Sequence, residues 1–248
     1  MNNPPITELS IALQFEGQLD WKPLKAIDYF NRHKDEFPNL EFKVKLGALG
    51  GPQVPILETS DDLVPRYWYV SSDECMLVQV QNDLVAMNWR RRPQVGEAMR
   101  PYPGFEDMKK KFSDVVAECL ELGGLHGDVP VSVCNLYYDN VWPSSQPVPE
   151  IFTFWKALGI AVRQGPQVSF SIPVTDPKVG GGSKIDVTAG MGGVPVDDTI
   201  VPSARIAMAG YAHPGTLKNV WPALDVLHEQ IGVYLPKLVS DAVRESWS

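Results

Sequence analysis

The chain has 248 residues, of which 44% are hydrophobic and 21% charged, the balance of a globular protein that can bury a substantial core. Its formal net charge is −8 at pH 7, so nucleic acid is not an expected partner. No apolar run approaches the roughly 20 residues of a membrane-spanning helix, and the first ten residues do not resemble a secretion signal. The three cysteines are odd in number and widely spaced, so we expect reduced thiols in a cytoplasmic protein.

The first half of the chain is predicted to contain five strands and two helices. Alternating or aromatic-rich runs predict strands at 9–15, 40–46, 66–71, 76–81 and 84–89, and apolar periodicity predicts helices at 21–37 and 105–122. Asn82-Asp83 separates two of the strands as a hairpin turn. The second helix carries Phe112 on its apolar face, and two glycines follow it as a C-terminal cap.

The second half repeats nearly the same order of elements. Strands are predicted at 131–139, 167–174, 184–189 and 204–212, a short helix at 150–158 and a final helix at 217–245. The glycine-rich stretch 190–202 is expected to be irregular. Pro236 should kink the final helix or split it in two.

These elements predict an α+β fold made of two pseudo-repeated β-α-β(3-4)-α modules. The first module covers residues 1–125 and the second covers 126–248. Each module closes with an amphipathic helix, so we expect antiparallel sheet with the helices packed on one face. Two separate sheets and one merged, continuous sheet in a single domain are both consistent with this order.

A basic corner, Arg90 to Arg92, stands at the end of the strand 84–89. One interpretation is that it binds a phosphate, a nucleotide or an acidic partner surface. The other is that one arginine meets a carboxylate within the protein and the other two lie in solvent. If Trp89 packs inward, strand alternation places Asn88 and Arg90 together on the opposite face, which makes Arg90 the anchor of the corner.

Polar side chains elsewhere complete the candidate binding region. The binding residues that the sequence suggests are Asn88, Arg90, Arg92, Tyr102, Tyr137 and Asn140. Asp139, between the last two, is a further polar group that this region can use. The simpler interpretation is that adjacent residues such as Tyr137 and Tyr138 point to opposite faces of a strand and that one of each pair is structural.

No catalytic residue, metal ligand or cofactor is expected from the motifs. The four histidines lack metal-site spacing, and no Gly-x-Ser-x-Gly elbow occurs. The run Gly180 to Lys184 differs from a phosphate-binding loop, because Ser183 separates the glycines from the lysine and Ile185 occupies the Ser/Thr position. No dinucleotide-binding fingerprint follows a predicted strand.

Three segments carry a resemblance to a known protein family. They are NDLVAMNWRRR with PYPGFEDMKKKF, VCNLYYDNV, and the C-terminal LDVLHEQIGVYL, with Asn88, Trp89, Arg90, Tyr102, Pro103, Phe105, Phe112, Tyr137, Tyr138, Asn140, Leu227, His228 and Ile231 as the matching positions. The pattern is similar to an uncharacterised, sporadically distributed family of bacterial proteins. The resemblance implies a fold and a bacterial origin but no activity.

Two functional hypotheses follow. The first is a non-enzymatic binding or regulatory protein that acts through a protein partner, in bacterial defence or toxin neutralisation, and that can form homo-oligomers. The second is a small-molecule-binding protein or enzyme with a pocket between sheet and helices that uses Arg90, Tyr102 and Tyr137. A closed cavity lined by these residues favours the second hypothesis, and a broad sheet face available to a partner favours the first.

Overall fold

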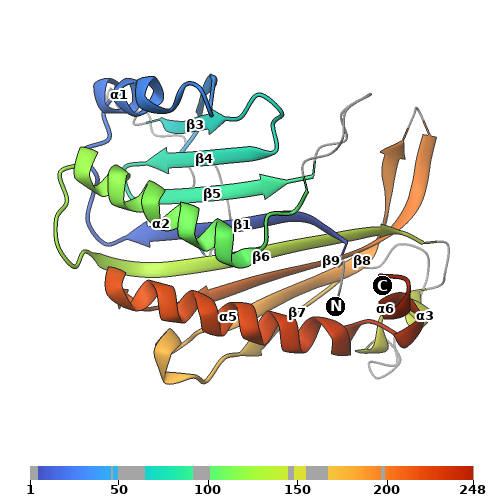
Figure 1. Ribbon diagram of the computed structural model, residues 1–248. Coiled ribbons are helices and arrows are strands. Elements are labelled where there is room, and N and C mark those ends of the chain that lie inside the picture. Colours follow the sequence, from blue (N-terminus) through green and yellow to red (C-terminus); the bar gives the residue numbers. More distant parts are fainter. Residues whose placement is uncertain are drawn as a thin grey trace.

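The structure, a computed structural model, describes residues 5–45, 47–49, 65–91, 101–144, 148–154, 167–196 and 199–247. Within these residues the strands form one antiparallel sheet with the order β2-β3-β4-β5-β1-β6-β9-β8-β7 (Figure 1). The strand bounds are β1 Ile6–Phe15, β2 Asn39–Lys43, β3 Arg66–Val70, β4 Met76–Gln81, β5 Leu84–Arg90, β6 Pro130–Pro143, β7 Gln167–Pro173, β8 Lys184–Val196, β9 Thr199–Ala212 and β10 Gly215–Thr216. The two-residue β10 pairs with β6 outside this order.

The first strand of the chain lies in the middle of the sheet. β1 pairs with β5 along one side and with β6 along the other. Its alternating apolar residues Leu9, Ile11 and Leu13 are fully buried, so the first strand lies at the centre of the core. The sheet is therefore continuous from the first half of the chain into the second.

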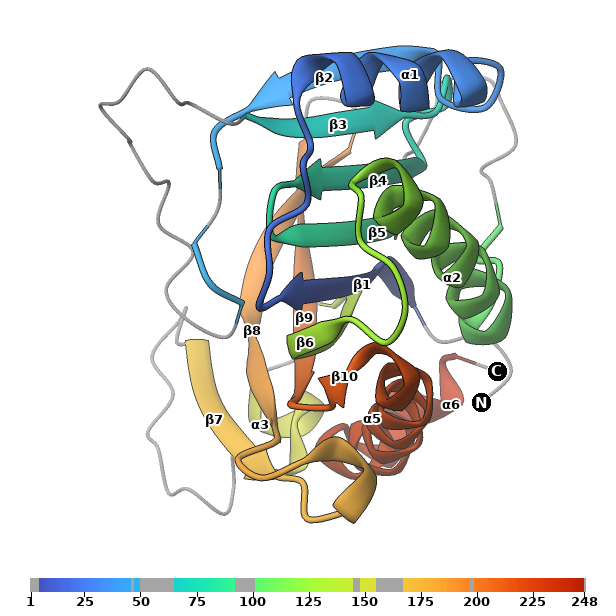
Figure 2. The same cartoon turned by 90° about the vertical axis from the view of Figure 1, so that its left-hand side faces the viewer.

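The main helices cover one face of this sheet, as Figure 2 shows for α2 and α5. The helix bounds are α1 Pro23–His33, α2 Phe105–Leu122, α3 Val148–Ile151, α5 Leu217–Leu238 and α6 Asp241–Glu245, with a short 3-10 helix at Pro177–Val179. α1, α2 and α5 all contribute buried residues to the same core cluster, including Tyr29, Phe112 and Leu227. One hydrophobic core thus fills the layer between helices and sheet.

The predicted elements agree with the structure in kind and differ in several bounds. Helix 105–122 and the hairpin around Asn82-Asp83 are confirmed, whereas helix 21–37 is shorter, at Pro23–His33. The final helix divides into α5 and α6 at Val239 and Ser240 rather than at Pro236, which lies inside α5. Val239 is extended and forms a bridge with Phe152, and this pairing explains the position of the break.

The prediction for residues 190–202 was wrong. β8 and β9 continue through this stretch as a long hairpin whose pairing reaches Val196 and Thr199. Glycine lowers strand propensity, but the ladder between the two strands supplies the backbone hydrogen bonds that override it. The helix predicted at 150–158 is described only up to residue 154, where α3 covers Val148–Ile151.

The three cysteines are free and buried, and no described helix is long and apolar enough to cross a membrane.

The packing of α2 against the sheet generates a stability prediction. Phe112 is fully buried in the core, so Phe112→Ala should lower the free energy of unfolding by about 3–5 kcal/mol. Ile200 is 78% exposed, and Ile200→Ala should cost less than about 1 kcal/mol. Urea denaturation of both variants measures this difference, and equal losses would show that the buried face of α2 is assigned wrongly.

Candidate functional site

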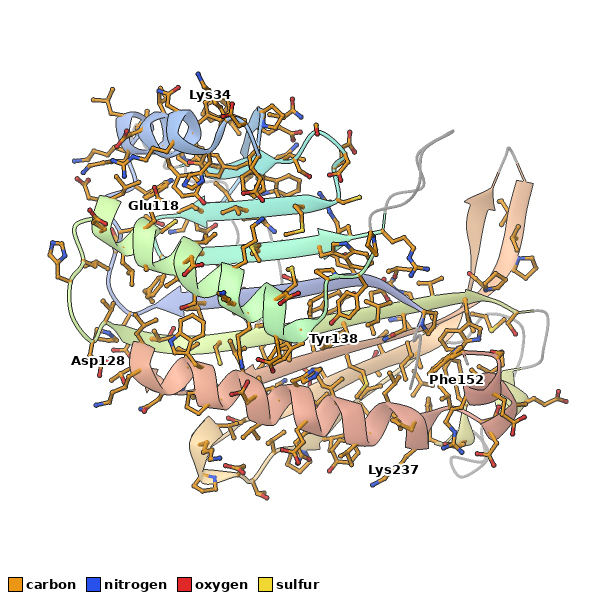
Figure 3. The ribbon with its side chains drawn as sticks, in the orientation of Figure 1. Lys34, Glu118, Asp128, Tyr138, Phe152 and Lys237 are labelled. Carbon is orange, nitrogen blue, oxygen red and sulfur yellow. The ribbon has the colours of Figure 1, made fainter. Side chains whose placement is uncertain are left out.

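The candidate site lies on the face of the sheet opposite α1, α2 and α5, which we call the open face. Strand alternation places Leu9 and Ile11 toward the helices and Ser10 and Ala12 toward the open face. The same alternation in β6 places Tyr138 on the helix side, where Figure 3 labels it, and Tyr137 on the open face. The sequence therefore builds a sheet with one apolar side and one mixed side.

Two hollows lie side by side on the open face. One has a volume of about 620 Å³ and is lined by residues of β6, β7, β8 and β9, and the other has about 290 Å³ and is lined mainly by residues of β4, β5, β1, β6 and β9. Tyr137 borders both hollows. Together they form a trough across the strands, which we call the sheet trough.

Small residues make the floor of the sheet trough. Among the residues that line it are Ser10, Ala12, Ala86, Gly190, Gly192, Ala207 and Ala209. Alanine and glycine have low strand propensity. Their small side chains leave space above the backbone on this face, and that space gives the trough its depth. The larger hollow also lies where the far ends of β8 and β9 turn out of line with the neighbouring strands (Figure 1).

A chain of hydrogen bonds fixes the polar side chains at one end of the trough. Gln79 Nε2 donates to Asn88 Oδ1 over 2.7 Å, and Asn88 Nδ2 donates to Glu8 Oε1 over 2.9 Å. Burial raises the pKa of the Glu8 carboxyl, and the hydrogen bond from Asn88 and the charge of Arg90 act against this rise. Three neighbouring strands thus hold one partly buried carboxyl in a defined position.

A second set of linked hydrogen bonds lies in the larger hollow. Arg205 Nε donates to Asp139 Oδ1 over 2.7 Å, and Arg205 Nη2 donates to the Tyr137 hydroxyl over 3.1 Å. The hydrogen bond to Asp139 raises the pKa of Arg205, and burial raises the pKa of Tyr137 to about 12. The arginine side chain is 55% exposed and the aspartate only 12%, so the guanidinium presents donors to the hollow while its counter-ion lies beneath.

The pairing register brings four charged side chains close together, because Arg90, Asp139 and Arg205 all act on the Glu8 carboxyl. Glu8 lies opposite Arg90 on one side and opposite Asp139 on the other. A β-bulge at Thr7, whose hydroxyl donates to the carbonyl of Asp139, lets Ile6 and Glu8 point to different faces. Two carboxylates that face each other across strands repel, and the flanking arginines offset that repulsion.

The structure separates the binding residues that the sequence suggested. Asn88 and Arg90 share the open face, as alternation predicted, with Trp89 fully buried on the other side. Tyr137 lies on the same open face. Tyr102 packs against Trp89 on the helix side, with ring centroids 5.3 Å apart, three residues before α2 begins. Arg92 lies outside the described residues.

Asn140 is not part of the open-face site. It is fully buried and its side-chain amide donates to the carbonyl of Ile206 over 3.3 Å. Alternation along β6 explains this, because Asn140 lies between Asp139 and Val141, which line the larger hollow, and therefore points to the helix side. The interpretation of Asn140 as a binding residue is therefore corrected to a structural role.

Sequence reasoning missed Glu8, Gln79 and Arg205. Each is a polar residue in an alternating strand, and that alternation alone could have assigned its face. Their proximity to Asn88, Asp139 and one another depends on strand order, which places β1 between β5 and β6, and the sequence pattern does not encode that order.

Most positions that carried the family resemblance gather on the helix side instead. Phe105 stacks on His228 with centroids 4.0 Å apart, and the Tyr138 hydroxyl lies 2.9 Å from His228 Nδ1. Burial lowers the pKa of His228, as expected for a histidine enclosed by aromatic rings. This cluster joins α2, α5 and β6 and is best explained as core packing.

Within the described residues, no three histidine, cysteine, aspartate or glutamate side chains are placed to hold a metal ion.

Comparisons of the chain with protein-family models, with curated proteins and with solved structures found no match.

Arg90 and Arg91 provide a test of the register at the basic corner. The Arg90 guanidinium lies 5.9 Å from the centre of the Trp68 ring and close enough to Glu8 to affect its pKa, whereas Arg91 is exposed. Arg90→Ala should lower the free energy of unfolding by about 1.5 kcal/mol, and Arg91→Ala should change it by less than about 0.5 kcal/mol. Equal effects in denaturant melts would contradict the assigned faces.

Glu8 generates a pH-dependent prediction. Because its folded-state pKa is raised, ionisation of Glu8 reduces stability as pH rises from the unfolded-state pKa to the folded-state pKa, and the loss levels off above it. Glu8→Gln keeps the acceptor for Asn88 and removes the ionisation. Its stability relative to the unsubstituted chain should therefore increase between about pH 4 and about pH 7. Thermal melts across this range measure the difference, and a difference that stays constant or falls would contradict the raised pKa.

Proposed function

We propose that the chain is a non-enzymatic binding protein that holds an extended segment of a partner protein in the sheet trough. The observation that carries this proposal is the extent of the trough, whose lining residues come from seven adjacent strands, β4 to β7 in the sheet order. At about 4.8 Å between strands this corresponds to about 29 Å, the length of about nine extended residues.

The position of the hollows also favours a polypeptide over an enclosed small molecule. Ligand pockets for small molecules bury most of the ligand between elements of the protein. The two hollows of the sheet trough lie instead on one sheet face, on the side away from the helix layer. The second hypothesis from the sequence required a pocket between sheet and helices, and neither hollow has that location.

The side chains along the trough suit protein recognition. Tyrosine and arginine are enriched at protein interfaces because they combine apolar area with hydrogen-bond donors. Tyr137, Tyr211 and Arg205 stand over a floor of alanine and glycine, so a partner's backbone can approach closely between them. The fixed hydrogen bonds of Arg205 reduce the entropy that it loses on binding.

The net charge of the chain and its resemblance to a bacterial protein family are the basis for proposing what kind of partner it binds. The net charge of −8 favours association with a protein of net positive charge. The resemblance to a sporadic bacterial family suits a defence or toxin-neutralising role, in which occupation of the trough blocks the partner's own surface. Reduced, buried thiols are consistent with a cytoplasmic location for this function.

We also propose that residues 1–125 and 126–248 are pseudo-repeats. The support is the strand order on the two sides of the β1–β6 pair, which reads β1-β5-β4-β3 outward on one side and β6-β9-β8-β7 on the other. In sequence each set is a strand followed later by an antiparallel meander and then by a long helix, α2 or α5. On this interpretation the sheet trough crosses the junction of two related modules.

A pair of matched substitutions tests the binding function. Ala207 is on the trough floor and Ala117 is exposed on α2, on the opposite side of the molecule. Ala207→Tyr should fill the larger hollow and reduce partner binding by at least roughly tenfold, or about 1.4 kcal/mol. Ala117→Tyr makes the same change in chemistry and should leave binding unchanged.

The measurement is native mass spectrometry of the full chain purified with its bound species from the source cell. The proposal expects a protein partner on the unsubstituted chain and on Ala117→Tyr, and its loss from Ala207→Tyr with the fold retained by circular dichroism. A bound small molecule in place of a protein would overturn the proposal in favour of the ligand hypothesis. Equal partner binding by both variants would place the interface elsewhere.

A further inference from the structure

The edge strand β2 and its neighbour α1 expose an unusual amount of apolar surface. Six large hydrophobic residues are exposed in the described part of the chain, and four of them lie here, namely Leu24, Ile27, Phe42 and Val44. Phe42 is 63% exposed although it belongs to a paired strand, and Val44, which directly follows β2, is 50% exposed. A cluster of this kind at a sheet edge indicates an interaction surface.

The hydrogen bonds of β3 determine which residues of β2 direct their backbone amides and carbonyls away from the sheet. Ser71 N donates to the carbonyl of Met76, so Ser71 directs its backbone groups to β4, and alternation assigns Val70 and Trp68 to β2. Their register partners Asn39 and Glu41 therefore bond to β3. The amides and carbonyls of Leu40 and Phe42 point away from the sheet, at an edge where the described strands end.

We propose that this edge pairs with the β2 strand of a second copy of the chain, in an antiparallel two-fold arrangement centred on Phe42. This pairing places Phe42 opposite its own symmetry mate and Leu40 opposite Val44 of the second copy. All three residues direct backbone groups outward if the strand alternation continues to Val44, so about six backbone hydrogen bonds can form across the junction. The same residues bring apolar side chains together on the helix side.

The charged residues of β2 match the same arrangement. Glu41 and Lys43 share the other side of the strand, where their side chains pair over 2.7 Å. The two-fold centred on Phe42 places Glu41 opposite Lys43 of the second copy and Lys43 opposite Glu41. Opposite charges directly across strands stabilise pairing, and like charges destabilise it. The strand is thus self-complementary in apolar and charged positions at once, which commits this edge to a second copy.

α1 extends the apolar surface beside β2. Arg32 and His33 of α1 contact Glu118 of α2, which directs that side of the helix toward α2. Ile27 is about 140° away from Arg32 around the helix, so it faces away from α2, and it is exposed. Figure 2 shows α1 next to β2 at this end of the molecule. The exposed apolar residues of α1 therefore add to the apolar surface at the β2 end of the molecule.

This dimer leaves the trough accessible. A two-fold axis through an antiparallel strand pair is perpendicular to the sheet, so both helix layers lie on one side and both open faces on the other. The two sheets become one, and two sheet troughs face the same direction. The inference does not depend on the identity of the partner that occupies them.

Charge reversal on the full chain tests the pairing. Glu41→Lys places a lysine opposite Lys43 of the second copy twice per dimer, and Lys43→Glu places a glutamate opposite Glu41 twice. Each single variant should weaken dimerisation by at least roughly tenfold. The double variant E41K/K43E restores opposite charges across the junction and should recover dimerisation. Analytical ultracentrifugation over a concentration series measures the dissociation constant of each protein.

A control for exposed apolar surface accompanies these variants. Phe42→Lys places two like charges at the axis and should abolish the dimer, whereas Ile200→Lys, at a residue 78% exposed on the β8–β9 hairpin, should not change it. Circular dichroism confirms that each variant is folded. A monomeric unsubstituted chain, a double variant no better than the single ones, or loss of the dimer in Ile200→Lys would overturn the proposal.

Discussion

The pairing of β1 with β6 is the interaction on which the rest of the structure depends. These strands, one from each half of the chain, lie side by side over most of β1, from Ile6 to Phe15. The contact is long-range in sequence, so it can form only after the chain has closed a loop of more than a hundred residues. Once formed, it makes one sheet from two sets of strands and places the first strand at the centre of the core.

That central position gives the two faces of the sheet different properties. On the helix side, large residues such as Leu13, Leu136 and Trp89 pack under three helices. On the open face, small residues and fixed polar side chains leave a trough across the strands. A sheet that is covered on one face only must keep its other face partly polar, and here the register concentrates those polar groups near the β1–β6 pair. The geometry of the proposed binding surface therefore follows from the same pairing that holds the core together.

Local patterns predicted much of this arrangement. The period change at the hairpin and α2 predicted the strands, the helix and the inward orientation of Trp89 and Phe112, because burial and periodicity act within one element. The long β8–β9 hairpin was not predicted, since its glycines lower strand propensity and only the cross-strand ladder overrides them. Asn140 was grouped with Tyr137, but the two are three residues apart in β6, whose register against β9 is unbroken, so alternation places them on opposite faces. Glu8 and Arg205 were missed because strand order decides which polar residues become neighbours.

Native-state hydrogen exchange tests the central claim, that the β1–β6 pair joins both halves into one cooperative unit. Amides in the middle of β1, such as those of Ile11 and Leu13, should exchange only through global unfolding, together with the central amides of β5, β6 and β9. The edge strands β2 and β7 should exchange through smaller, local openings. If β1, β4 and β5 instead opened as a group at a lower free energy than β6, β8 and β9, the halves would be independent units. The account of a single sheet with one shared trough would then be contradicted.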